Sequence, residues 1–450
     1  MRRARVVIAA AAIGIVGAGS ALFYAWQPAL APITPPAPAT FDQALVRRGA
    51  ELALLGDCQT CHTAPGGRTF AGSLAMPTPF GTIYSTNITP DPETGIGRWS
   101  EAAFARALRE GVDREGRHLY PAFPYDHFTL ISDDDVRALY AFFMSREPVT
   151  STPPPNALPF PINVRLVLAG WKLLFLDRGR FEPDPSRDQL WNRGKYLVEG
   201  FGHCGGCHTP RNVMGAEKTS RAFAGGEAEG WRAYALGAAS QAPTPWNEAA
   251  LTQYLSRGFH PLHGVARGPM APVVANLAQV PQQDIIAMAR YMASLSKPET
   301  AEANAQPAQP LPEQGPGIVP QSAGSQAPTP VAGTADGAGI YATACASCHA
   351  SDRPLPLGAI RLSLSTAITD DSPDNLINII LSGIPASNGT AGPIMPSFSS
   401  AMSAGQISDL ARYLRSSFTT AAPWADVDDT VRTAIAEQRK ARAQRLNPDR

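Results

Sequence analysis

The chain has 450 residues, and Lys plus Arg equals Asp plus Glu at 38 each. This balance gives no indication of nucleic acid or an acidic substrate as a partner, and the length predicts about three domains of roughly 150 residues each. The 43 prolines indicate linkers and irregular loops between short regular elements.

The amino terminus has the order of an export signal. Three arginines within the first five residues precede an uncharged, mostly apolar run from Val6 to Trp26. The run has about the length of a membrane span, which favours an uncleaved anchor, although residues 29–31 offer a cleavage site of the Ala-x-Ala kind. Either outcome places the body of the chain on the periplasmic side of the inner membrane. We therefore expect residues 1–30 to be an anchor or a signal.

The pentapeptide Cys-x-x-Cys-His occurs three times and contains every cysteine of the chain. Two cysteines three apart share one face of a helical turn, so both can form thioethers with the vinyl groups on one edge of a porphyrin. Structural zinc, a disulfide framework and a thioredoxin-like redox pair are the alternatives, but every cluster ends in a histidine and no second cysteine pair lies nearby. We predict three covalently bound haem c groups, attached through Cys58, Cys61, Cys204, Cys207, Cys345 and Cys348, with the irons bound by His62, His208 and His349.

The rest of the chain divides into three similar units. Glycine stands shortly before each motif, in Arg48-Gly49, Arg193-Gly194 and Gly339-Ile340-Tyr341. Each unit closes with a helix-like segment that has an aromatic residue at a matching place, namely Phe142, Tyr291 and Tyr413. Small helical haem domains have this pattern, in which an amino-terminal helix bearing the motif crosses a carboxy-terminal one. We predict a mainly α-helical chain with three tandem class I-like cytochrome c domains, at residues 41–147, 188–298 and 335–420.

Two linkers and a tail separate or follow these domains. Residues 148–187 form the first linker, and residues 299–334, rich in Pro, Ala, Gln and Gly, form the second. The first linker contains an apolar stretch from Ile162 to Leu176 that is too short to span a bilayer, so a helix packed on a haem domain is favoured over a membrane-surface contact. The tail at residues 421–450 mixes both charge signs, and we expect a solvated helix from Val427 onwards, with a docking role for its arginines as the alternative.

The sixth iron ligand is predicted from its spacing to the closing aromatic. Methionine and histidine are the usual choices in electron-transfer haems. Met270 stands 21 positions and Met395 18 positions before the aromatic of their units. We predict these two methionines as iron ligands, with His260 and His263 as competitors in the second unit and a core methionine as the alternative for each.

The first unit has no methionine at this place. The corresponding residue is Phe123, which cannot bind iron. His127, four residues further on, is the predicted ligand, and Met76, His118 and Met144 are its rivals. A surface or core role for His127 stays open as the alternative.

Longer motifs resemble known proteins over most of the chain. They run from Phe80 to Asp91, from Gly95 to Trp99 and from Leu119 to Ala122 in the first unit, and from His203 to Asn212 and His263 to Met270 in the second. These segments are similar to the tri-haem cytochrome c subunits of bacterial membrane-bound dehydrogenases. The resemblance implies an electron-transfer subunit rather than a substrate-oxidising one.

Two branches of that family compete. One serves quinoprotein alcohol dehydrogenases and flavoprotein gluconate, sorbitol or fructose dehydrogenases, and typically has methionine where this chain has Phe123. The other serves molybdenum hydroxylases of the nicotinate, isoquinoline and membrane-bound aldehyde dehydrogenase type. Its members resemble this chain from Ala122 to Phe128 and from Pro423 to Asp426. The resemblance favours the molybdenum branch by analogy.

In that branch the resemblance implies a large molybdopterin subunit that oxidises the substrate and a small iron-sulfur subunit that delivers electrons to these haems. The electrons would then pass to ubiquinone or a terminal oxidase. Because methionine ligation raises the potential, a histidine pair would make the first haem the lowest of the three, so electrons would enter near Cys58. The alternative class is a multihaem peroxidase or a thiosulfate-oxidising cytochrome with an open iron in the first unit. No nucleic-acid motif competes with the haem sites.

Overall fold

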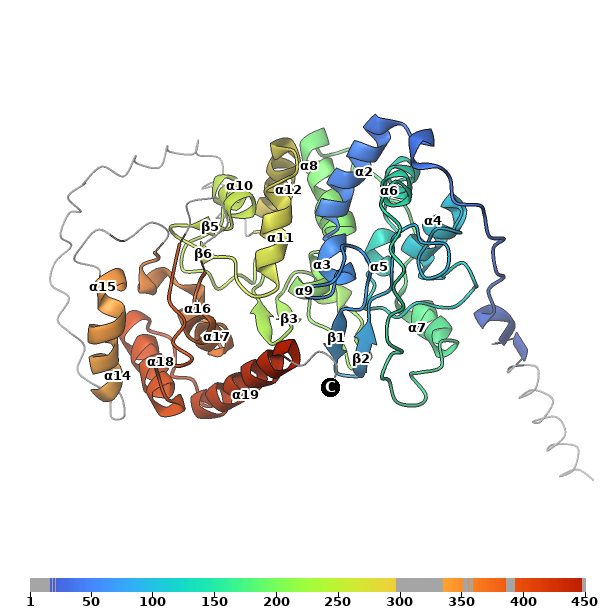
Figure 1. Cartoon of the computed structure of the whole chain (residues 1–450). Coiled ribbons are helices and arrows are strands. Elements are labelled where there is room, and N and C mark those ends of the chain that lie inside the picture. The colour runs from blue at the N-terminus through green and yellow to red at the C-terminus, as the bar shows by residue number, and fades with distance from the viewer. Residues whose placement is uncertain are drawn as a thin grey trace, which may run out of the picture. The chain divides into compact units, whose positions relative to one another are not determined.

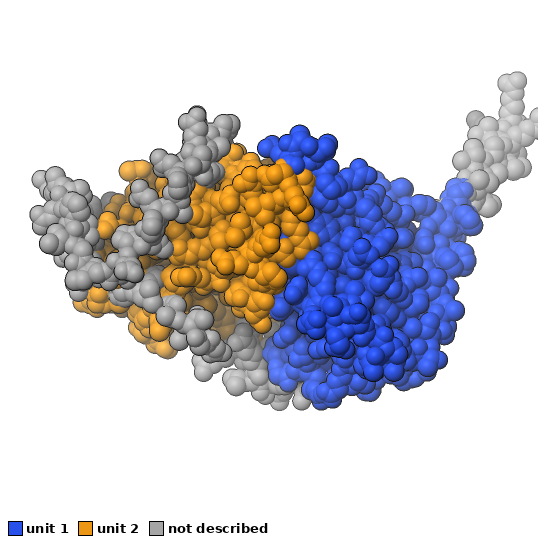
Figure 2. Space-filling view, turned by 90° about the horizontal axis from the view of Figure 1, so that it is seen from above, with its two compact units in different colours: residues 1–187, 196–203, 213–216 blue, residues 188–195, 204–212, 217–450 orange. Residues whose placement is uncertain are grey.

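The computed structural model describes residues 17, 19–20, 22–296, 335–350, 355, 359–385 and 393–446. These residues are mainly helical, with short two-stranded antiparallel sheets between the helices (Figure 1). The chain forms two compact units, coloured separately in Figure 2. The first comprises Met1–Arg187, Tyr196–His203 and Val213–Ala216, and the second comprises Asp188–Lys195, Cys204–Asn212 and Glu217–Arg450. The first unit therefore contains one Cys-x-x-Cys-His motif, and the second unit contains two.

The elements of the first unit surround its motif. In chain order they are η1 (Pro38–Thr40), α2 (Gln43–Leu55), α3 (Cys58–His62), β1 (Ala75–Thr78), β2 (Gly81–Tyr84), α4 (Glu101–Glu110), α5 (Tyr125–Phe128), α6 (Asp133–Met144), α7 (Val167–Phe175) and the π-helical turn η2 (Tyr196–Phe201).

The second unit contains the elements around the other two motifs. Around its first motif lie α8 (Gln189–Lys195), α9 (Gly205–His208), η3 (Thr219–Arg221), β3 (Gly226–Ala228), β4 (Trp231–Ala233), α10 (Glu248–Arg257), β5 (Phe259–His260), β6 (Gly264–Val265), α11 (Met270–Leu277) and α12 (Gln282–Ser294). Around its second motif lie α14 (Ala335–Ile340), η4 (Tyr341–Cys345), α15 (Ala346–His349), η5 (Leu362–Leu364), α16 (Thr366–Thr369), α17 (Asp374–Ser382), α18 (Ala404–Phe418) and α19 (Val427–Leu446).

One helix crossing occurs three times, and a glycine makes each of them possible. The helix before the motif packs on the helix that closes the domain, in the pairs α2 with α6, α8 with α12 and α14 with α18. A β-carbon added to Gly49 would lie 2.0 Å from the Ala138 carbonyl oxygen, and one added to Gly194 would lie 1.9 Å from the Ala287 oxygen. No side chain fits at such distances, so the backbones touch only because the residue is glycine.

The third crossing differs in one detail from the sequence-based expectation. Gly337, rather than Gly339, occupies the crossing point, because a β-carbon at Gly337 would lie 2.3 Å from the Asp409 oxygen, whereas nothing lies within 4 Å of one at Gly339. The three aromatic residues expected at matching places are all at the crossing. The β-carbons of Phe142, Tyr291 and Tyr413 lie 2.6, 2.9 and 2.7 Å from where a β-carbon on the crossing glycine would stand.

An ion pair supports two of the three crossings. The Arg48 Nε lies 3.4 Å from the Asp135 carboxylate. The guanidinium of Arg193 makes two bonds of 2.8 and 3.0 Å to Asp284. In the third domain Asp336 stands where the other two have arginine, so the pair is not repeated there.

The helix starts follow from capping side chains. Ser132 accepts a hydrogen bond from the Asp135 amide at the start of α6, and Ser403 forms a capping box with Gln406 at the start of α18. Ser100 and Asn247 cap α4 and α10 in the same manner. These residues satisfy backbone N–H groups that have no partner within the helix.

The apolar stretch of the first linker forms α7, which packs on the first unit as expected. Its buried face includes Trp171, whose Nε1 donates to the Met214 carbonyl at 3.0 Å. Lys172 is also buried, and its ammonium donates to the carbonyls of Glu110 at 2.6 Å and Gly111 at 2.5 Å. The opposite face of α7 is apolar and exposed, with Leu173 and Leu174 in contact with solvent.

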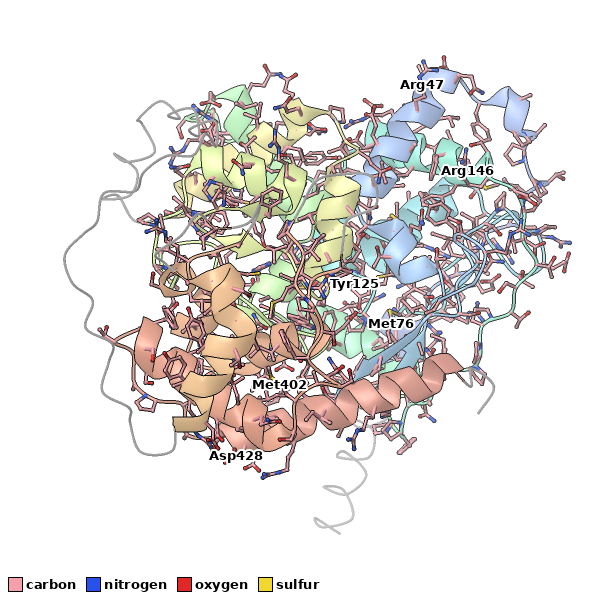
Figure 3. All side chains as sticks on the ribbon, turned by 60° about the vertical axis from the view of Figure 1, so that its left-hand side comes forward. Arg47, Met76, Tyr125, Arg146, Met402 and Asp428 are labelled. Carbon is pink, nitrogen blue, oxygen red and sulfur yellow. The ribbon has the colours of Figure 1, made fainter. Side chains whose placement is uncertain are left out.

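The carboxy-terminal tail is helical, but it is not wholly solvated as the sequence predicted. Val427 and Val431 on α19 are buried together with Trp424, in the same core as α17 and α18. Asp428, labelled in Figure 3, pairs with Arg412 of α18 at 2.6 Å. The tail therefore belongs to the third domain, because its apolar residues recur at helical spacing and complete that core.

The predicted anchor and the second linker lie mostly outside the described residues. Within the described part of the chain, no helix has both the length and the apolar composition needed to cross a membrane. The described end of the predicted anchor contacts the first unit, because the Ala25 carbonyl is 2.8 Å from Nε2 of His118.

Candidate haem-binding sites

Each Cys-x-x-Cys-His motif forms a single helical turn. α3 begins at Cys58 and ends at His62, while Cys204 and Cys345 are the amino-terminal caps of α9 and α15, which end at His208 and His349. The two cysteines of each motif therefore share one face, as the spacing predicts. All six cysteines lie in the described residues, and none of them forms a disulfide bond.

The three motif histidines have the same hydrogen-bond arrangement. Nδ1 lies 2.7 Å from the Thr86 oxygen in His62, 2.5 Å from the Tyr234 oxygen in His208 and 3.2 Å from the Ile360 oxygen in His349. A carbonyl oxygen can only accept, so Nδ1 carries the proton and the lone pair is on Nε2. Burial also lowers the pKa of all three histidines, which keeps each imidazole neutral. A neutral imidazole fixed through Nδ1 is the usual state of an iron-binding histidine.

Burial raises the pKa of the first cysteine in each motif, to about 12 for Cys58 and Cys204 and to about 11 for Cys345. Catalytic or redox cysteines have the opposite setting, with a lowered pKa in an electropositive environment. The arrangement of two cysteines on one face and a neutral histidine with Nε2 as the ligand atom fits a covalently bound haem c. Bound haem supplies one-electron redox chemistry, and the chain supplies its attachment, orientation and surroundings.

In each of the first two sites, a glycine in the left-handed conformation donates a backbone hydrogen bond to the motif histidine. The amide of Gly72 donates to the His62 carbonyl at 2.8 Å, and the amide of Gly225 donates to the His208 carbonyl at 2.8 Å. Their φ angles are 75° and 87°, which L side chains rarely adopt. A short hairpin follows each glycine and leads to the carbonyl that bonds the histidine. The sequence alone did not identify these carbonyls, although Thr86 lies within the motif from Phe80 to Asp91.

We call the side of each site that contains the motif histidine the proximal side, and the opposite side the distal side. The two predicted distal methionines occupy different local structures. Met270 begins α11, and Met395 exchanges two backbone hydrogen bonds of 2.8 and 2.9 Å with Ile384. Both methionines are partly buried. They stay predictions as iron ligands.

The two competing histidines of the second domain are engaged elsewhere. Nδ1 of His260 accepts a hydrogen bond of 3.2 Å from the Leu262 amide, which puts the proton on Nε2 and leaves no lone pair there for iron. His263 is stacked on the indole of Trp246, with ring centroids 3.6 Å apart and an angle of 13° between the planes. The tautomer of His260 speaks against it as an iron ligand, while Met270 and His263 stay predictions.

The first domain places Phe123 and His127 in different surroundings. Phe123 packs on the cluster that contains Tyr125 and Trp171. His127 is in α5, where its Nδ1 is 2.7 Å from the Glu199 oxygen of η2, so Nε2 again has the lone pair.

His203 lies next to His127, with ring centroids 6.4 Å apart. Its Nε2 is 3.3 Å from the carbonyl of Gly56, two residues before the first motif. His203 is thus a neighbour of the first site that the sequence did not single out, because it stands 145 residues after Cys58 and directly before the second motif.

The three rivals of His127 as ligand of the first iron lie in different surroundings. His118 is a buried core residue, with Nε2 on the Ala25 oxygen and Nδ1 3.0 Å from the ammonium of Lys172. Met144 is 1% exposed at the end of α6. Met76 lies in β1 opposite Ile83 and is labelled in Figure 3. Both nitrogens of His118 are thus occupied, which leaves His127 as the better histidine.

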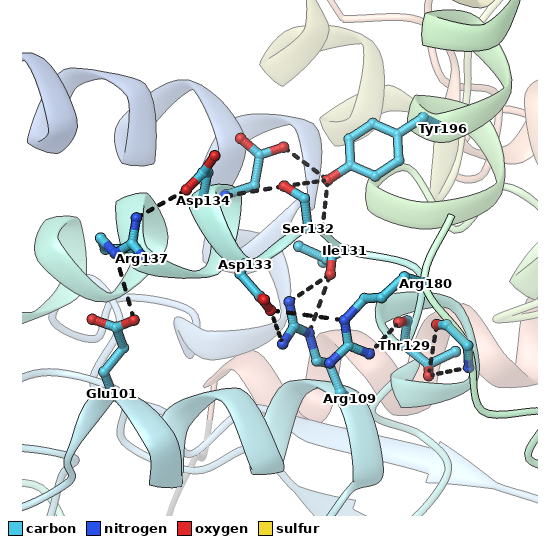
Figure 4. Close-up of polar contacts among 12 residues, drawn as sticks. Glu101, Arg109, Thr129, Ile131, Ser132, Asp133, Asp134, Arg137, Arg180 and Tyr196 are labelled. Atoms are coloured by element: carbon cyan, nitrogen blue, oxygen red, sulfur yellow. Dashed lines mark hydrogen bonds and ion pairs between the residues drawn. The ribbon is translucent and has the colours of Figure 1, made fainter. Parts of the chain in front are cut away.

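A polar network around the buried Arg109 fixes the turn that follows His127 (Figure 4). Arg109 donates to the Ile131 carbonyl at 2.7 and 3.1 Å and pairs with Asp133 at 2.6 Å. The hydroxyl of Tyr196 accepts from the Ser132 amide at 3.0 Å and donates to Asp135 at 2.8 Å. The network joins α4, α6 and η2, so the segment between α5 and α6 has a defined position.

The fold and the repeated sites define the class of protein: the chain is a c-type cytochrome, with covalently bound haem c. A family model described as cytochrome c oxidase, cbb3-type, subunit III matches residues 332–414, which include the third motif.

Similar proteins identify the family. The chain is 37% identical over 401 residues to the gluconate 2-dehydrogenase cytochrome c subunit of Pantoea cypripedii, an alignment that covers 84% of this chain and 86% of that protein. It is 36% identical over 402 residues to the fructose dehydrogenase cytochrome subunit of Gluconobacter japonicus, covering 86% and 82%. The chain belongs to this family of dehydrogenase cytochrome c subunits, which transfer electrons. The resemblance to dehydrogenase cytochrome c subunits seen in the sequence is confirmed.

A third relative is more similar still. A nicotinate dehydrogenase subunit of Pseudomonas putida is 47% identical over 402 residues, which is 88% of this chain. The chain spans only 32% of the length of that protein.

Proposed function

We propose that this chain carries three haems and transfers electrons from a membrane-bound dehydrogenase to the respiratory chain. The observation that supports it most is the proximal arrangement, in which three motif histidines each have Nδ1 on a backbone carbonyl. A haem count by alkaline pyridine spectroscopy and by intact mass tests this proposal. We expect three haems per chain, and a count of two or fewer would contradict it.

The proposed iron ligands are His62 with His127, His208 with Met270, and His349 with Met395. The chain would hold each haem from the proximal side through the cysteines and the histidine, and the distal residue would set the potential. A histidine pair would give the first haem the lowest potential, so electrons would enter there and leave through the other two. A redox titration in which the first haem lies at or above the others would contradict this order.

The proposed partners are a large molybdopterin subunit and a small iron-sulfur subunit, with ubiquinone or a terminal oxidase as the electron acceptor. The support is the 47% identity to the nicotinate dehydrogenase subunit and the presence of Phe123 rather than methionine. A quinoprotein or flavoprotein dehydrogenase is the second candidate, favoured by the relatives that match over more of their own length. Purification of the complex, followed by analysis for molybdenum, flavin and a bound quinone cofactor, separates the two candidates.

The proposed location is the periplasmic side of the inner membrane. Exposed apolar side chains support it, since Leu173 and Leu174 on α7 are 67% and 66% exposed and Phe160 is 81% exposed. Phe23 and Trp26, within the predicted anchor, are 80% and 63% exposed. Removal of residues 1–30 behind a separate export signal would weaken membrane association, and adding Leu173→Glu should release what remains.

An enzymatic role is the alternative of another class. It requires an open iron in the first domain, where Phe123 replaces methionine. Rapid cyanide binding to one haem of the oxidised protein would support this alternative. If His127 binds the iron, all three haems are low-spin and cyanide binds slowly.

A further inference from the structure

In the first two domains, a hairpin leads to the carbonyl that accepts a hydrogen bond from the motif histidine. One side of the hairpin packs on the haem motif, and the other side contacts a segment from elsewhere in the chain. In the second domain this hairpin is β3 and β4. A β-carbon on Gly226 would lie 2.3 Å from the Cys207 oxygen, so β3 packs directly on the motif. The residue after β4 is Tyr234, whose carbonyl accepts from Nδ1 of His208. A shift of β4 therefore shifts the acceptor that orients His208.

The third haem domain contacts β4 at the residue two before that carbonyl. The Arg232 amide donates to Oδ1 of Asn375 at 2.9 Å, and Nδ2 of Asn375 donates to the Arg232 carbonyl at 2.9 Å. Asn375 is 5% exposed and lies in the first turn of α17. One side chain thus pairs with both backbone groups of Arg232, as a neighbouring strand would.

Further contacts fix the same junction. The Arg232 guanidinium lies 2.7 Å from the Asp370 carboxylate, which is 6% exposed. The backbone of Asp370 is anchored in the third domain, since its carbonyl accepts from Nε1 of Trp424 at 2.9 Å and from Arg415 at 2.9 Å. β4 is therefore tied to a fixed part of the third domain.

The first domain has the same contact from a different source. The Tyr84 amide, two residues before the Thr86 carbonyl that bonds His62, donates to Oδ1 of Asn156 at 2.9 Å. Asn156 belongs to the linker that directly follows the first domain, and its neighbour Ala157 pairs with Thr82 of β2. An asparagine thus holds the equivalent strand in both domains.

We propose that Asn375 of the third haem domain is a positioning residue for the proximal histidine of the second haem. It does for His208 what Asn156 does for His62, but from another domain. The third domain thereby sets the hydrogen bond on Nδ1 of His208, which controls the basicity of that ligand and so the potential of its haem. The inference rests on the proposed haem function of the second motif.

The test uses the full chain with its haems and the Asn375→Ala variant. A weaker hydrogen bond makes the imidazole a poorer donor to ferric iron, so the second haem should become easier to reduce. We expect the ratio of reduced to oxidised haem at a fixed potential to rise by up to about tenfold, which is about 59 mV for a one-electron couple. Hydrogen exchange of the Arg232 amide should accelerate in the same variant.

Matched variants separate the positioning of His208 from a general loosening of the contact between the second and third domains. Asn378→Ala removes a bond of 2.9 Å to the Gly230 carbonyl, in the same interface but farther from Tyr234, and should leave the second haem unchanged. Asn156→Ala should shift the first haem instead. Asn375→Leu fills a similar volume without side-chain hydrogen-bonding groups. It replaces Asn375→Ala in the test if the third domain does not fold in the alanine variant.

Two results would overturn the proposal. One is an unchanged potential of the second haem with unchanged exchange at Arg232. The other is a shift confined to the third haem, which would give Asn375 a role only in its own domain. A haem count below three would instead defeat the proposed function, while the exchange measurement would still report whether Asn375 holds β4.

Discussion

The proximal and distal sides of the three sites differ in how strictly they repeat. On the proximal side, every motif histidine bonds a carbonyl through Nδ1, and every domain has a glycine at the helix crossing. On the distal side, the candidates are His127 in a short helix, Met270 at a helix start and Met395 in a two-residue bridge. The difference shows that the attachment side is held by local structure that repeats, whereas the proposed ligands of the other side lie in three different local structures.

The proximal repeat is best tested at Gly337, where the largest effect is expected. Gly337→Ala places a β-carbon 2.3 Å from the Asp409 oxygen, so the helices must separate. We expect a loss of about 3 kcal/mol or more, since overpacking typically costs about 1–3 kcal/mol and backbone adjusts less than side chains. Chemical unfolding of the third domain, followed by its haem absorbance, measures this.

Gly339→Ala is the matched control, because open space surrounds that position. It should be neutral or stabilising by up to about 1 kcal/mol, since alanine is the better helix former. Equal effects at the two glycines would show that the crossing does not depend on close backbone contact.

Met270→Ala and Met395→Ala test the two proposed methionine ligands of the distal side. Each variant should convert one haem from low-spin to high-spin and leave the other two unchanged, because each methionine is the proposed ligand of one iron. Electron paramagnetic resonance of the oxidised protein measures this. Met402→Ala is the control, since Met402 packs on the core of the third domain as Met395 does but is not a proposed ligand. A low-spin spectrum in either test variant would assign the ligand elsewhere.

Two histidine variants test the distal side of the first domain, where the proposed ligand is a histidine and not a methionine. His127→Ala should change the spectrum of one haem with little loss of stability. His118→Ala should leave the spectrum intact and cost about 1–3 kcal/mol, because it leaves the buried ammonium of Lys172 with one fewer partner. A spectral change in the His118 variant alone would reverse these roles.

The smallest effect concerns the ion pair that supports two of the crossings. Asp284→Asn removes the charge from a carboxylate that is 12% exposed and bonded twice by Arg193, and should cost about 1–2 kcal/mol. Asp188→Asn breaks an exposed pair with Arg290 and should cost less stability than Asp284→Asn, because solvent screens the exposed charges. Thermal unfolding compares the two, and equal costs would make the pair at the crossing an ordinary surface contact.

The sequence predicted the proximal side well because its determinants are local. A pentapeptide fixes the two cysteines and the histidine on one turn, and a repeated aromatic marks each helix crossing. The sequence named Gly339 in the third repeat, but two glycines stand close together and only contact with Asp409 identifies Gly337 as the crossing glycine. The buried face of α19 was missed because the charges of the tail outnumber its few valines.

What the sequence could not predict depends on contacts between distant segments. The carbonyls of Thr86 and Tyr234 lie 24 and 26 residues beyond their histidines, and any residue can supply a carbonyl. Asn375 meets Arg232 across 143 residues. The engagement of His118 with Ala25, 93 residues away, likewise left no pattern in the sequence.

The burial of Trp424, Val427 and Val431 in the third domain has a consequence for the order of maturation. The core around the third motif closes only after these residues have been synthesised, far beyond the end of α6 at Met144, which completes the helix crossing of the first domain. A chain that ends before Trp424 should therefore fail to close the core around the third motif, although the helix crossing of its first domain is complete.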